Sequence, residues 1–352
     1  MASQDGGGFR LNVLNPAGRD PEQHFADNTR VDFDAHAPVN YHAYAACTGG
    51  SFLRDVEAAI SARAPVLLLL RGDFRAAERA LSALKSAGIL TAVCFKETGL
   101  HQIAEQLNDV ARLSRFMRIA QAADGCIAPT PEAADIFRGV RRSSVGVTFF
   151  PTPYPVHDAR WDFSRRIEER SGIFVGTREW DVPSRNHFAA LAMARELSDA
   201  TGAHVTLYDF EGRKGARLLR EMGFAPDKLR VITEREPYAK YLRRLAEHRI
   251  VFQLDTSFVP GQVAGDALLC RLPCIGGNGA VDRLGHPRTC GHGRSGTRIL
   301  TLATELLTDE RAYEQAIDDS QRAAGEWLSF SGVAAELEKF YGSLRSAEPA
   351  KA

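Results

Sequence analysis

The stretch DTSFVPGQVAGDALLCRLPCIGGNG, Asp255 to Gly279, decides the fold of this chain. The apolar segment Ile250 to Leu254 precedes it and predicts a strand, and the small-residue loop ending at Gly261 predicts the start of a short helix, Gln262 to Cys270. A second strand is expected at Pro273 to Ile275. A strand, a loop, a helix and a strand in this order form a βαβ unit, whose helix begins at the carboxyl edge of a parallel sheet.

The start of this helix is suited to an anion, because unpaired backbone N–H groups and the helix dipole both point at it. The residues Gly261, Gln262, Val263 and Ala264 are therefore expected to contact phosphate. Asp266 is the acidic residue in the first turns of the helix, and a carboxylate suits hydroxyl groups rather than phosphate. A phosphate beside a ribose or sugar diol is the ligand that this stretch predicts.

The composition is that of a globular protein with two domains. The chain has 352 residues, of which 44% are hydrophobic and 25% charged, and its formal net charge is zero. A neutral chain has no global field that attracts nucleic acid, so no nucleic-acid partner is expected. No apolar run approaches the ~20 residues that span a bilayer, and the start MASQDGGG has no secretory apolar region. These features predict a cytoplasmic protein.

Residues 1–155 predict a first α/β domain. A first strand, Arg10 to Asn15, runs into a loop with Gly18, where such a domain admits a ligand close to its backbone. The polar segment Arg19 to Ser51 predicts an irregular loop that either lines an acceptor cleft or is a plain excursion. Helices and strands then alternate, with helices expected at Phe52 to Arg63 and at His101 to Ala123.

Two polar residues of this domain are candidates for the site. Glu97 and His101 directly follow the strand ILTAVCF, and ligands bind at the carboxyl ends of parallel strands. Both residues are candidates for positioning an acceptor or for acid–base work, with a plain helix cap as the alternative. Prolines at 151, 153 and 155 then interrupt the pattern, and a stiff connector of this kind predicts the domain boundary.

Residues 156–330 predict a second α/β domain that begins with the strand GIFVG, Gly172 to Gly176. The same alternation leads through the βαβ unit at Asp255 to Gly279 and ends with a helix from Glu310 to Leu328. Residues 331–352 predict a last helix, Ser331 to Leu344, and a disordered tail, SAEPAKA.

Two Rossmann-like halves joined by a proline-rich connector resemble the GT-B glycosyltransferases, particularly the retaining family-4 type. The segment IFVGTREWDVPSRNHFAALAMARELS is similar to the family's segment in which a strand ends in Gly, an Arg follows, and a Lys comes at the start of a helix. Gly176 and Arg178 match the first positions, and Arg185 stands where the family usually has Lys. The resemblance implies that both arginines hold the donor diphosphate, since guanidinium also binds phosphate well.

The opening stretch resembles the family's acidic motif. GDALLCRLPCIGG carries Asp266 at the second acidic position, which in the family binds the ribose hydroxyls of the nucleotide. The first Glu of the motif, which contacts the donor sugar, is replaced by Phe258. In the first domain, the loop from Asn15 to Gly18 is similar to the family's Gly-rich loop near the acceptor.

The resemblance implies a GT-B fold, with two Rossmann-like domains facing a central cleft and a C-terminal helix that returns to the first domain. It implies a hexosyltransferase that moves a sugar from a UDP- or GDP-sugar to a hydroxyl of a glycan, lipid-linked or small-molecule acceptor. Transfer is expected to retain the anomeric configuration and to need neither metal nor cofactor. Arg178 and Arg185 would stabilise the departing phosphate, while Glu97 and His101 would serve the acceptor.

Other interpretations stay open. Phe258 makes a non-catalytic nucleotide-sugar-binding protein an alternative, and a GT-B sugar-nucleotide epimerase is another. The basic patch Phe137 to Arg142 predicts either peripheral contact with anionic lipid or a solvated turn. The segment RLGHPRTCGHGRSG predicts a flexible loop near the sugar, and a zinc site is weighed against it for five nearby residues, Cys270, Cys274, His286, Cys290 and His292.

Overall fold

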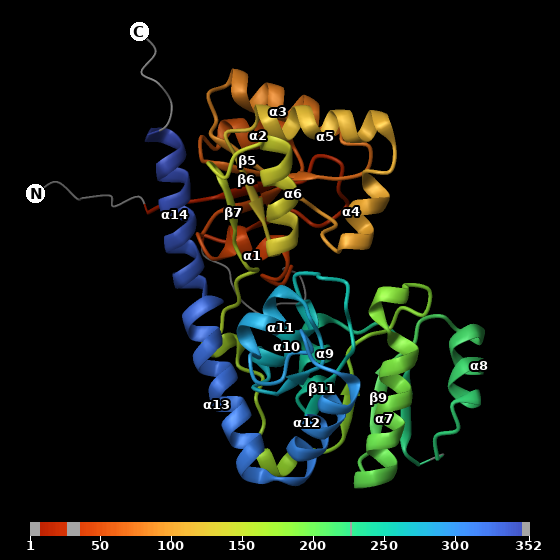
Figure 1. Cartoon of the computed structure of the whole chain (residues 1–352). Coiled ribbons are helices and arrows are strands. Elements are labelled where there is room, and N and C mark those ends of the chain that lie inside the picture. Colours follow the sequence, from red (N-terminus) through yellow and green to blue (C-terminus); the bar gives the residue numbers. More distant parts are fainter. Residues whose placement is uncertain (1–7, 27–35, 226, 347–352) are drawn as a thin grey trace, which may run out of the picture. The chain divides into compact units, whose positions relative to one another are not determined.

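The computed structural model of the chain describes residues 8–26, 36–225 and 227–346. Two compact units make up the chain (Figure 1). The first unit lies within Met1–Pro155 and Ser329–Ala352, and the second comprises Val156–Leu328. The second unit is therefore inserted into the first in sequence, and each unit is described by itself below. The tail predicted to be disordered lies, from residue 347 onward, outside the described residues.

The first unit is built on a sheet with the strand order β2-β3-β1-β4-β5-β6-β7. Its pairs are parallel except for β2 with β3. The strands are β1 (Asn12–Leu14), β2 (Gln23–His24), β3 (Ser51–Leu53), β4 (Val66–Leu70), β5 (Thr91–Phe95), β6 (Gly125–Ala128) and β7 (Val147–Phe149). The helices are α1 (Tyr41–Ala46), α2 (Val56–Ser61), α3 (Arg75–Ser86), α4 (Leu100–Gln106), α5 (Val110–Ala122), α6 (Pro131–Arg141) and α14 (Phe330–Ser346).

Apolar side chains cover both faces of this sheet. Along β4, Val66, Leu68 and Leu70 join one core cluster, whereas Leu67 and Leu69 join another. Successive side chains of a strand point to opposite faces, so a continuous apolar run marks a strand that is buried on both sides. The predicted parallel α/β sheet is confirmed.

Three sequence predictions for this unit are wrong. The helix expected at Phe52 to Arg63 is β3 followed by α2, because Asp55 caps a new helix by accepting from the N–H groups of Glu57 and Ala58. The helix expected at His101 to Ala123 is divided into α4 and α5, and Asp109 caps the second. The segment Arg19 to Ser51 is not simply irregular, since it contains β2 and the fully buried α1, although its residues 27–35 lie outside the described residues.

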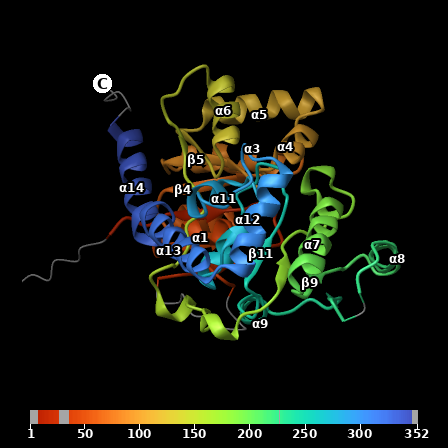
Figure 2. The same ribbon diagram turned by 60° about the horizontal axis from the view of Figure 1, so that its bottom comes forward.

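The last helix packs on the first unit, as the sequence predicts (Figures 1 and 2). Leu337 and Tyr341 of α14 lie in the core cluster on one face of the sheet, and the Tyr341 hydroxyl donates to the carbonyl of Val66 at 3.0 Å. A Cβ at Gly125 of β6 would lie 2.8 Å from the side chains of Phe340 and Leu344. A glycine in this strand therefore lets the helix approach the sheet closely.

The second unit is built on a parallel sheet with the strand order β10-β9-β8-β11-β12. The strands are β8 (Ile173–Val175), β9 (Val205–Tyr208), β10 (Leu229–Ile232), β11 (Ile250–Phe252) and β12 (Cys274–Ile275). The α-helices are α7 (His187–Thr201), α8 (Arg213–Glu221), α9 (Tyr238–Leu245), α10 (Gln262–Leu269), α11 (Ala280–Gly285), α12 (Gly296–Thr308) and α13 (Glu310–Trp327). Short 3₁₀ turns are η1 (Ala159–Trp161), η2 (Ile167–Glu169) and η3 (Pro183–Arg185).

The strand order reverses between β8 and β11. From β8 the chain adds β9 and β10 on one side, then crosses to add β11 and β12 on the other. The connections that leave β8 and β11 therefore diverge, and a crevice at the carboxyl ends of these two strands is where open α/β sheets bind ligands. The first sheet has the corresponding reversal between β1 and β4.

Candidate functional site

Gly176 and Val263 bring strand β8 and helix α10 together at the reversal of the second sheet. Gly176 directly follows β8, and a Cβ at this position would lie 2.5 Å from Cγ1 of Val263 in the first turn of α10. A glycine is needed here because the helix start approaches the strand end so closely. The two glycine-containing stretches identified in the sequence thus meet at one place.

The start of α10 has the properties of an anion site. Gly261 is the N-cap residue with φ 94°, a left-handed conformation that glycine adopts without strain. Among the described residues no side chain caps this end, and the first turn contains no acidic residue. The N–H groups of Gln262, Val263 and Ala264 therefore have no acceptor within the helix, and no acidic residue of the first turn neutralises the positive end of the dipole.

Asp266 lies further along α10 than the first turn and is only 2% exposed. The hydroxyl of Tyr238 donates to its Oδ1 at 2.5 Å. Burial raises the pKa of Asp266 to about 7, against the hydrogen bonds from Tyr238 and Tyr241 that favour the charged form. The Asp266 carboxyl group is therefore held in place by the hydroxyl groups of Tyr238 and Tyr241, both on α9.

The loop from Thr177 to Asn186 carries both candidate arginines. Arg178 is exposed, and its guanidinium carbon lies 5.5 Å from the centre of the Phe210 ring, with that of Arg235 at 5.7 Å from the same ring. The base of the loop is closed by a hydrogen bond of 3.0 Å between Thr177 Oγ1 and His187 Nδ1. This arrangement places cations and an aromatic ring at the carboxyl ends of β8, β9 and β10.

Arg185 lies near the C-terminal end of the same loop and is paired with Asp255, which follows β11. Asp255 is 4% exposed, and its second oxygen accepts from the N–H of Ser257 at 2.7 Å. A second carboxylate, Glu179, lies 3.9 Å from Arg185. The arginine is thus fixed by a buried partner at the reversal point, whereas Arg178 remains exposed.

The Trp180 ring contacts His187, at the end of this loop, and Asp209, which follows β9. It lies 4.4 Å from the ring of His187 in an edge-to-face arrangement, and its indole N–H donates to Asp209 at 3.2 Å. Asp209 also accepts from the N–H of Glu211, so it forms a turn after β9. Burial lowers the pKa of His187 to about 4, and the imidazole is therefore neutral at pH 7.

The first unit has a polar cluster at its own reversal point, between β1 and β4. Asn15 follows β1 and donates to Asp20 at 2.9 Å, and Lys96, after β5, is paired with Asp20 at 3.2 Å. Gly18 packs on this cluster, since a Cβ there would lie 2.0 Å from the Asn15 amide. Because Gly18 has no side chain, the backbone at this position can lie against the Asn15 amide.

Glu97 follows Lys96 of this cluster at the carboxyl end of β5, and His101 lies in the first turn of α4. Glu97 is paired with Arg71 at 3.4 Å, and Arg71 follows β4. Burial raises the pKa of Glu97 above its usual range, and the Arg71 charge opposes this rise. The structure thus places Gly18, Glu97 and His101 in the first unit, and all the other predicted site residues in the second.

The segment RLGHPRTCGHGRSG is not simply a flexible loop. Its first residues end α11, and His286 and Thr289 are buried. The Nε2 of His286 lies 3.0 Å from the carbonyl of Ala264, and its Nδ1 lies 3.3 Å from the N–H of Cys274 and 3.1 Å from the Ser320 hydroxyl. In residues 8–26, 36–225 and 227–346 no group of three or more His, Cys, Asp or Glu could hold a metal ion. His286 instead links α10, β12 and α13.

The basic patch Phe137 to Arg142 forms the C-terminal end of helix α6. Phe137 is fully buried, and Arg141 donates to the carbonyls of Ala120 and Ala123 at 2.9 and 2.8 Å. None of the helices described here is both long enough and apolar enough to cross a bilayer.

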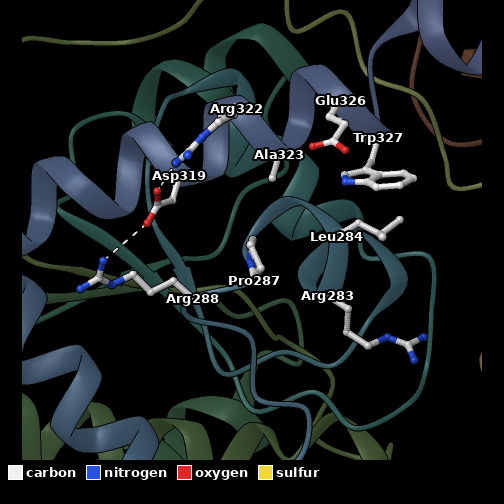
Figure 3. A pocket seen from close by; sticks show the side chains of 9 residues that line it. All are labelled: Arg283, Leu284, Pro287, Arg288, Asp319, Arg322, Ala323, Glu326 and Trp327. Carbon is white, nitrogen blue, oxygen red and sulfur yellow. Dashed lines mark hydrogen bonds and ion pairs between the residues drawn. The ribbon is translucent and has the colours of Figure 1, made fainter.

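A pocket of about 520 Å³ lies between α11 and α13 in the second unit (Figure 3). Asp319 on α13 is paired with both Arg288 and Arg322, while Trp327 stands at the other end of the pocket. Neither candidate arginine lines this pocket. The pocket is therefore separate from the cluster at the reversal of the sheet.

Sequence reasoning missed several residues of the second-unit site. Asp255 could have been found, because it directly follows a predicted strand at the same edge as the arginines. Trp180, His187 and Asp282 carry no local signal, since their contacts join segments that are distant in sequence.

We compared the sequence and the structure with those of known proteins. No protein-family model matches the sequence, and no curated protein matches it either. The structure of HepE from Anabaena in complex with UDP matches with a TM-score of 0.62 at 12% identity, covering 95% of this chain and 100% of that one. HepE has also been solved with UDP-glucose.

Two further solved structures share the architecture. A glycosyltransferase from Rickettsia africae ESF-5 matches with a TM-score of 0.59 at 9% identity, over 97% of this chain and 100% of that one. A putative UDP-N-acetylglucosamine 2-epimerase from Listeria monocytogenes matches with a TM-score of 0.50 at 14% identity, over 84% and 78% of the two chains. Identities this low establish the fold alone. The chain has the α/β GT-B fold, with a Rossmann-like sheet in each of its two units.

Proposed function

We propose that this chain is a glycosyltransferase that moves a sugar from a UDP- or GDP-sugar to an acceptor hydroxyl. The observation that carries the proposal is that the loop with Arg178 and Arg185 follows β8 and helix α10 follows β11, so both lie at the point where the second sheet reverses. Two cations and the backbone N–H groups of a helix start at one strand edge suit a diphosphate. HepE, which shares the fold, has been solved with UDP and with UDP-glucose, and this supports the same class of donor.

The donor lies along the carboxyl edge of the second sheet in this proposal. Its diphosphate contacts Arg178, Arg185 and the backbone of Gly261 to Ala264, and its ribose hydroxyls bind Asp266. The Phe210 ring, which lies near the guanidinium groups of Arg178 and Arg235, is the aromatic surface on which we propose that the base stacks.

The chemistry needs little from the protein beyond placement and charge. The bond between the anomeric carbon and the diphosphate oxygen breaks, and negative charge develops on that oxygen near the two arginines and the helix start. The acceptor oxygen bonds to the same face of the anomeric carbon, and its proton passes to the departing phosphate. Glu97 and His101 position the acceptor in this scheme, and transfer proceeds with retention of configuration.

We propose that the reaction needs no metal, since the arginines can neutralise the departing charge. The sequence does contain an Asp-x-Asp triplet, Asp32 to Asp34, which lies outside the described residues. Turnover that persists in EDTA supports the proposal, whereas turnover that requires added Mn²⁺ or Mg²⁺ contradicts it.

Release of UDP or GDP from a panel of nucleotide sugars, with and without glycan acceptors, tests the activity. Arg178→Ala should reduce release at least tenfold, because the variant loses a charged contact to the phosphate. Arg166→Ala is the control, since Arg166 is also an exposed arginine and is paired with Glu169, three residues further along the chain. Tight donor binding without any turnover would instead identify a non-catalytic nucleotide-sugar-binding protein, which Phe258 at the usual Glu position would then explain.

An epimerase is the second candidate, favoured by the likeness to the putative epimerase from Listeria monocytogenes. Incubation with UDP-N-acetylglucosamine followed by proton NMR would show inversion at C2 if the chain were such an enzyme. An unchanged C2 signal together with UDP release on adding acceptor selects the transferase.

The acceptor we propose is a glycan, a lipid-linked sugar or a small molecule. A lipid-linked acceptor would bring the first unit to a membrane surface, and exposed apolar residues occur there on α5, including Val110 at 80% exposure, with Leu113 and Met117 on the same side of the helix. Helix α5 packs beside α6, which carries the basic patch Phe137 to Arg142. Co-sedimentation with phosphatidylglycerol vesicles, compared between the unchanged chain and Val110→Asp, tests this contact.

A further inference from the structure

A second buried carboxyl group lies beside the start of α10. Asp282, in the first turn of α11, is 2% exposed. A Cβ at Gly277, Gly279 or Gly261 would lie 2.1, 2.7 or 2.9 Å from its carboxylate oxygens. These glycines belong to the loops that follow β11 and β12, so Asp282 occupies a cage that exists only because these positions lack side chains.

The cage supplies little positive charge to this carboxyl group. The Gln253 amide donates to its Oδ1 at 2.8 Å, and the Cys274 sulfur lies 3.8 Å from the same oxygen. Neither of these two groups carries a positive charge. Burial, together with the neighbouring Asp255 carboxylate, raises the pKa of Asp282 to about 7.

We propose that Asp282 takes up a proton from solvent when a nucleoside diphosphate sugar binds at the start of α10, and releases it when the nucleoside diphosphate leaves. The inference rests on the proposed function. Gly261 is both a wall of the cage and the N-cap of α10, so a bound diphosphate brings negative charge next to Asp282. Like charges disfavour the ionised carboxylate, and a proton on its oxygen removes the repulsion.

The Cys274 thiol and the His286 imidazole, which lie close to the cage, do not change charge near neutral pH. The Cys274 thiol is buried, which raises its pKa and keeps it protonated, and His286, one turn along from Asp282, has a pKa lowered to about 4. Arg185 is paired with Asp255. Asp266 also titrates near neutral pH, but its carboxyl is directed to Tyr238 rather than to the cage.

The first measurement needs no ligand. Between pH 5 and 7 the unfolded chain has lost the Asp282 proton while the folded chain still holds it, so folding is favoured less as pH rises. The unfolding equilibrium constant of the unchanged protein, relative to Asp282→Asn, should rise about tenfold per pH unit in this range and level off above pH 7. The same pH dependence in both proteins overturns the proposal whatever the protein binds.

The second measurement tests the coupling by titration calorimetry with UDP-glucose at pH 7, in phosphate and in Tris. Buffers with different ionisation enthalpies reveal protons taken up on binding, and we expect up to about half a proton per UDP-glucose for a group half protonated at that pH. Asp282→Asn should bind UDP-glucose without this uptake. Uptake that persists in Asp282→Asn, or binding without uptake in the unchanged protein, overturns the inference and leaves the proposed function standing.

Failure of the proposed function gives a different result. If neither UDP-glucose nor GDP-mannose binds the unchanged protein, nucleotide-sugar binding is wrong, and the coupling falls with it. The pH-dependent unfolding of the free protein then still reports whether Asp282 holds a proton.

Discussion

Arg185 and Asp255 form an ion pair that joins the loop after β8 to the end of β11, across the reversal of the second sheet. The Asp255 side chain is 5% exposed and that of Arg185 22%. A carboxylate so deeply buried depends on its partner, because removing the cation leaves an uncompensated charge. The same pair therefore serves the fold and, in the proposed function, the donor phosphate.

Arg185→Ala should destabilise the protein by about 3 to 5 kcal/mol, because the Asp255 charge stays buried without its partner. The double variant Arg185→Ala/Asp255→Asn removes that charge and should recover much of the loss. Guanidinium unfolding measures both variants. Equal destabilisation of the single and double variants would show that the pair contributes packing rather than charge compensation.

Gly176→Ala should cost about 1 to 3 kcal/mol, because the new Cβ would lie 2.5 Å from Val263 Cγ1. Gly176→Ala/Val263→Ala relieves the overlap and should be more stable than Gly176→Ala corrected for Val263→Ala alone. A double-mutant cycle by chemical unfolding gives this coupling energy. Strict additivity of the two substitutions would contradict the close approach of β8 and α10.

Protonation of His286 should destabilise the protein in mild acid. Burial lowers the pKa of His286 to about 4, so the folded state holds the neutral ring while the unfolded chain protonates near pH 6.5. Stability from this residue is complete above pH 6.5 and is lost as pH falls towards 4, by up to about 3 kcal/mol. His286→Gln should flatten this part of the stability curve, measured by unfolding from pH 7 to 4.

The control for this experiment is His157→Gln, since His157 is exposed. Its pH dependence should follow that of the unchanged protein. A slope in His286→Gln as steep as in the control would mean that His286 is not held neutral.

Helix α14 should be essential for the first unit. Leu337 is fully buried, so Leu337→Ala should cost about 2 to 5 kcal/mol through lost burial and a residual cavity. Tyr341→Phe should cost about 1 kcal/mol, because the Val66 carbonyl loses its hydrogen bond. Glu338→Ala, on the exposed side of the helix, is the control and should leave the unfolding midpoint unchanged within error.

The alternation of apolar strands and helices predicts the fold of both units, because parallel strands buried on both faces leave continuous apolar runs in the sequence. The return of the last helix to the first unit was predicted from the resemblance to GT-B proteins. The divisions at Asp55 and Asp109 were missed, although both residues are good helix caps, since the apolar rhythm continues through them. At these two positions the apolar pattern predicts one continuous element, whereas the capping residue predicts a new helix, and the structure has the new helix.

The burial of α1 had no local signal at all. Its tyrosines are satisfied by distant carbonyls, with the Tyr44 hydroxyl donating to Phe150 at 2.8 Å. Some residues of the site were predictable and others were not. Arg178, Arg185 and Gly261 could be predicted from motifs and from their positions after strands. Asp282 could not, because its surroundings are three glycines and a glutamine from neighbouring loops. Contacts of that kind exist only once the βαβ unit has folded.

The interleaving of the two units also bears on biosynthesis. The sheet of the first unit is complete once β7 has been made, but the face that α14 covers stays without its helix until the whole of Val156–Leu328 has been translated. At about 5 to 20 residues per second this interval lasts on the order of 10 to 40 s. During that time the part of this apolar face that Leu337 and Tyr341 cover in the folded chain has no helix on it, and we expect it to bind a ribosome-associated chaperone.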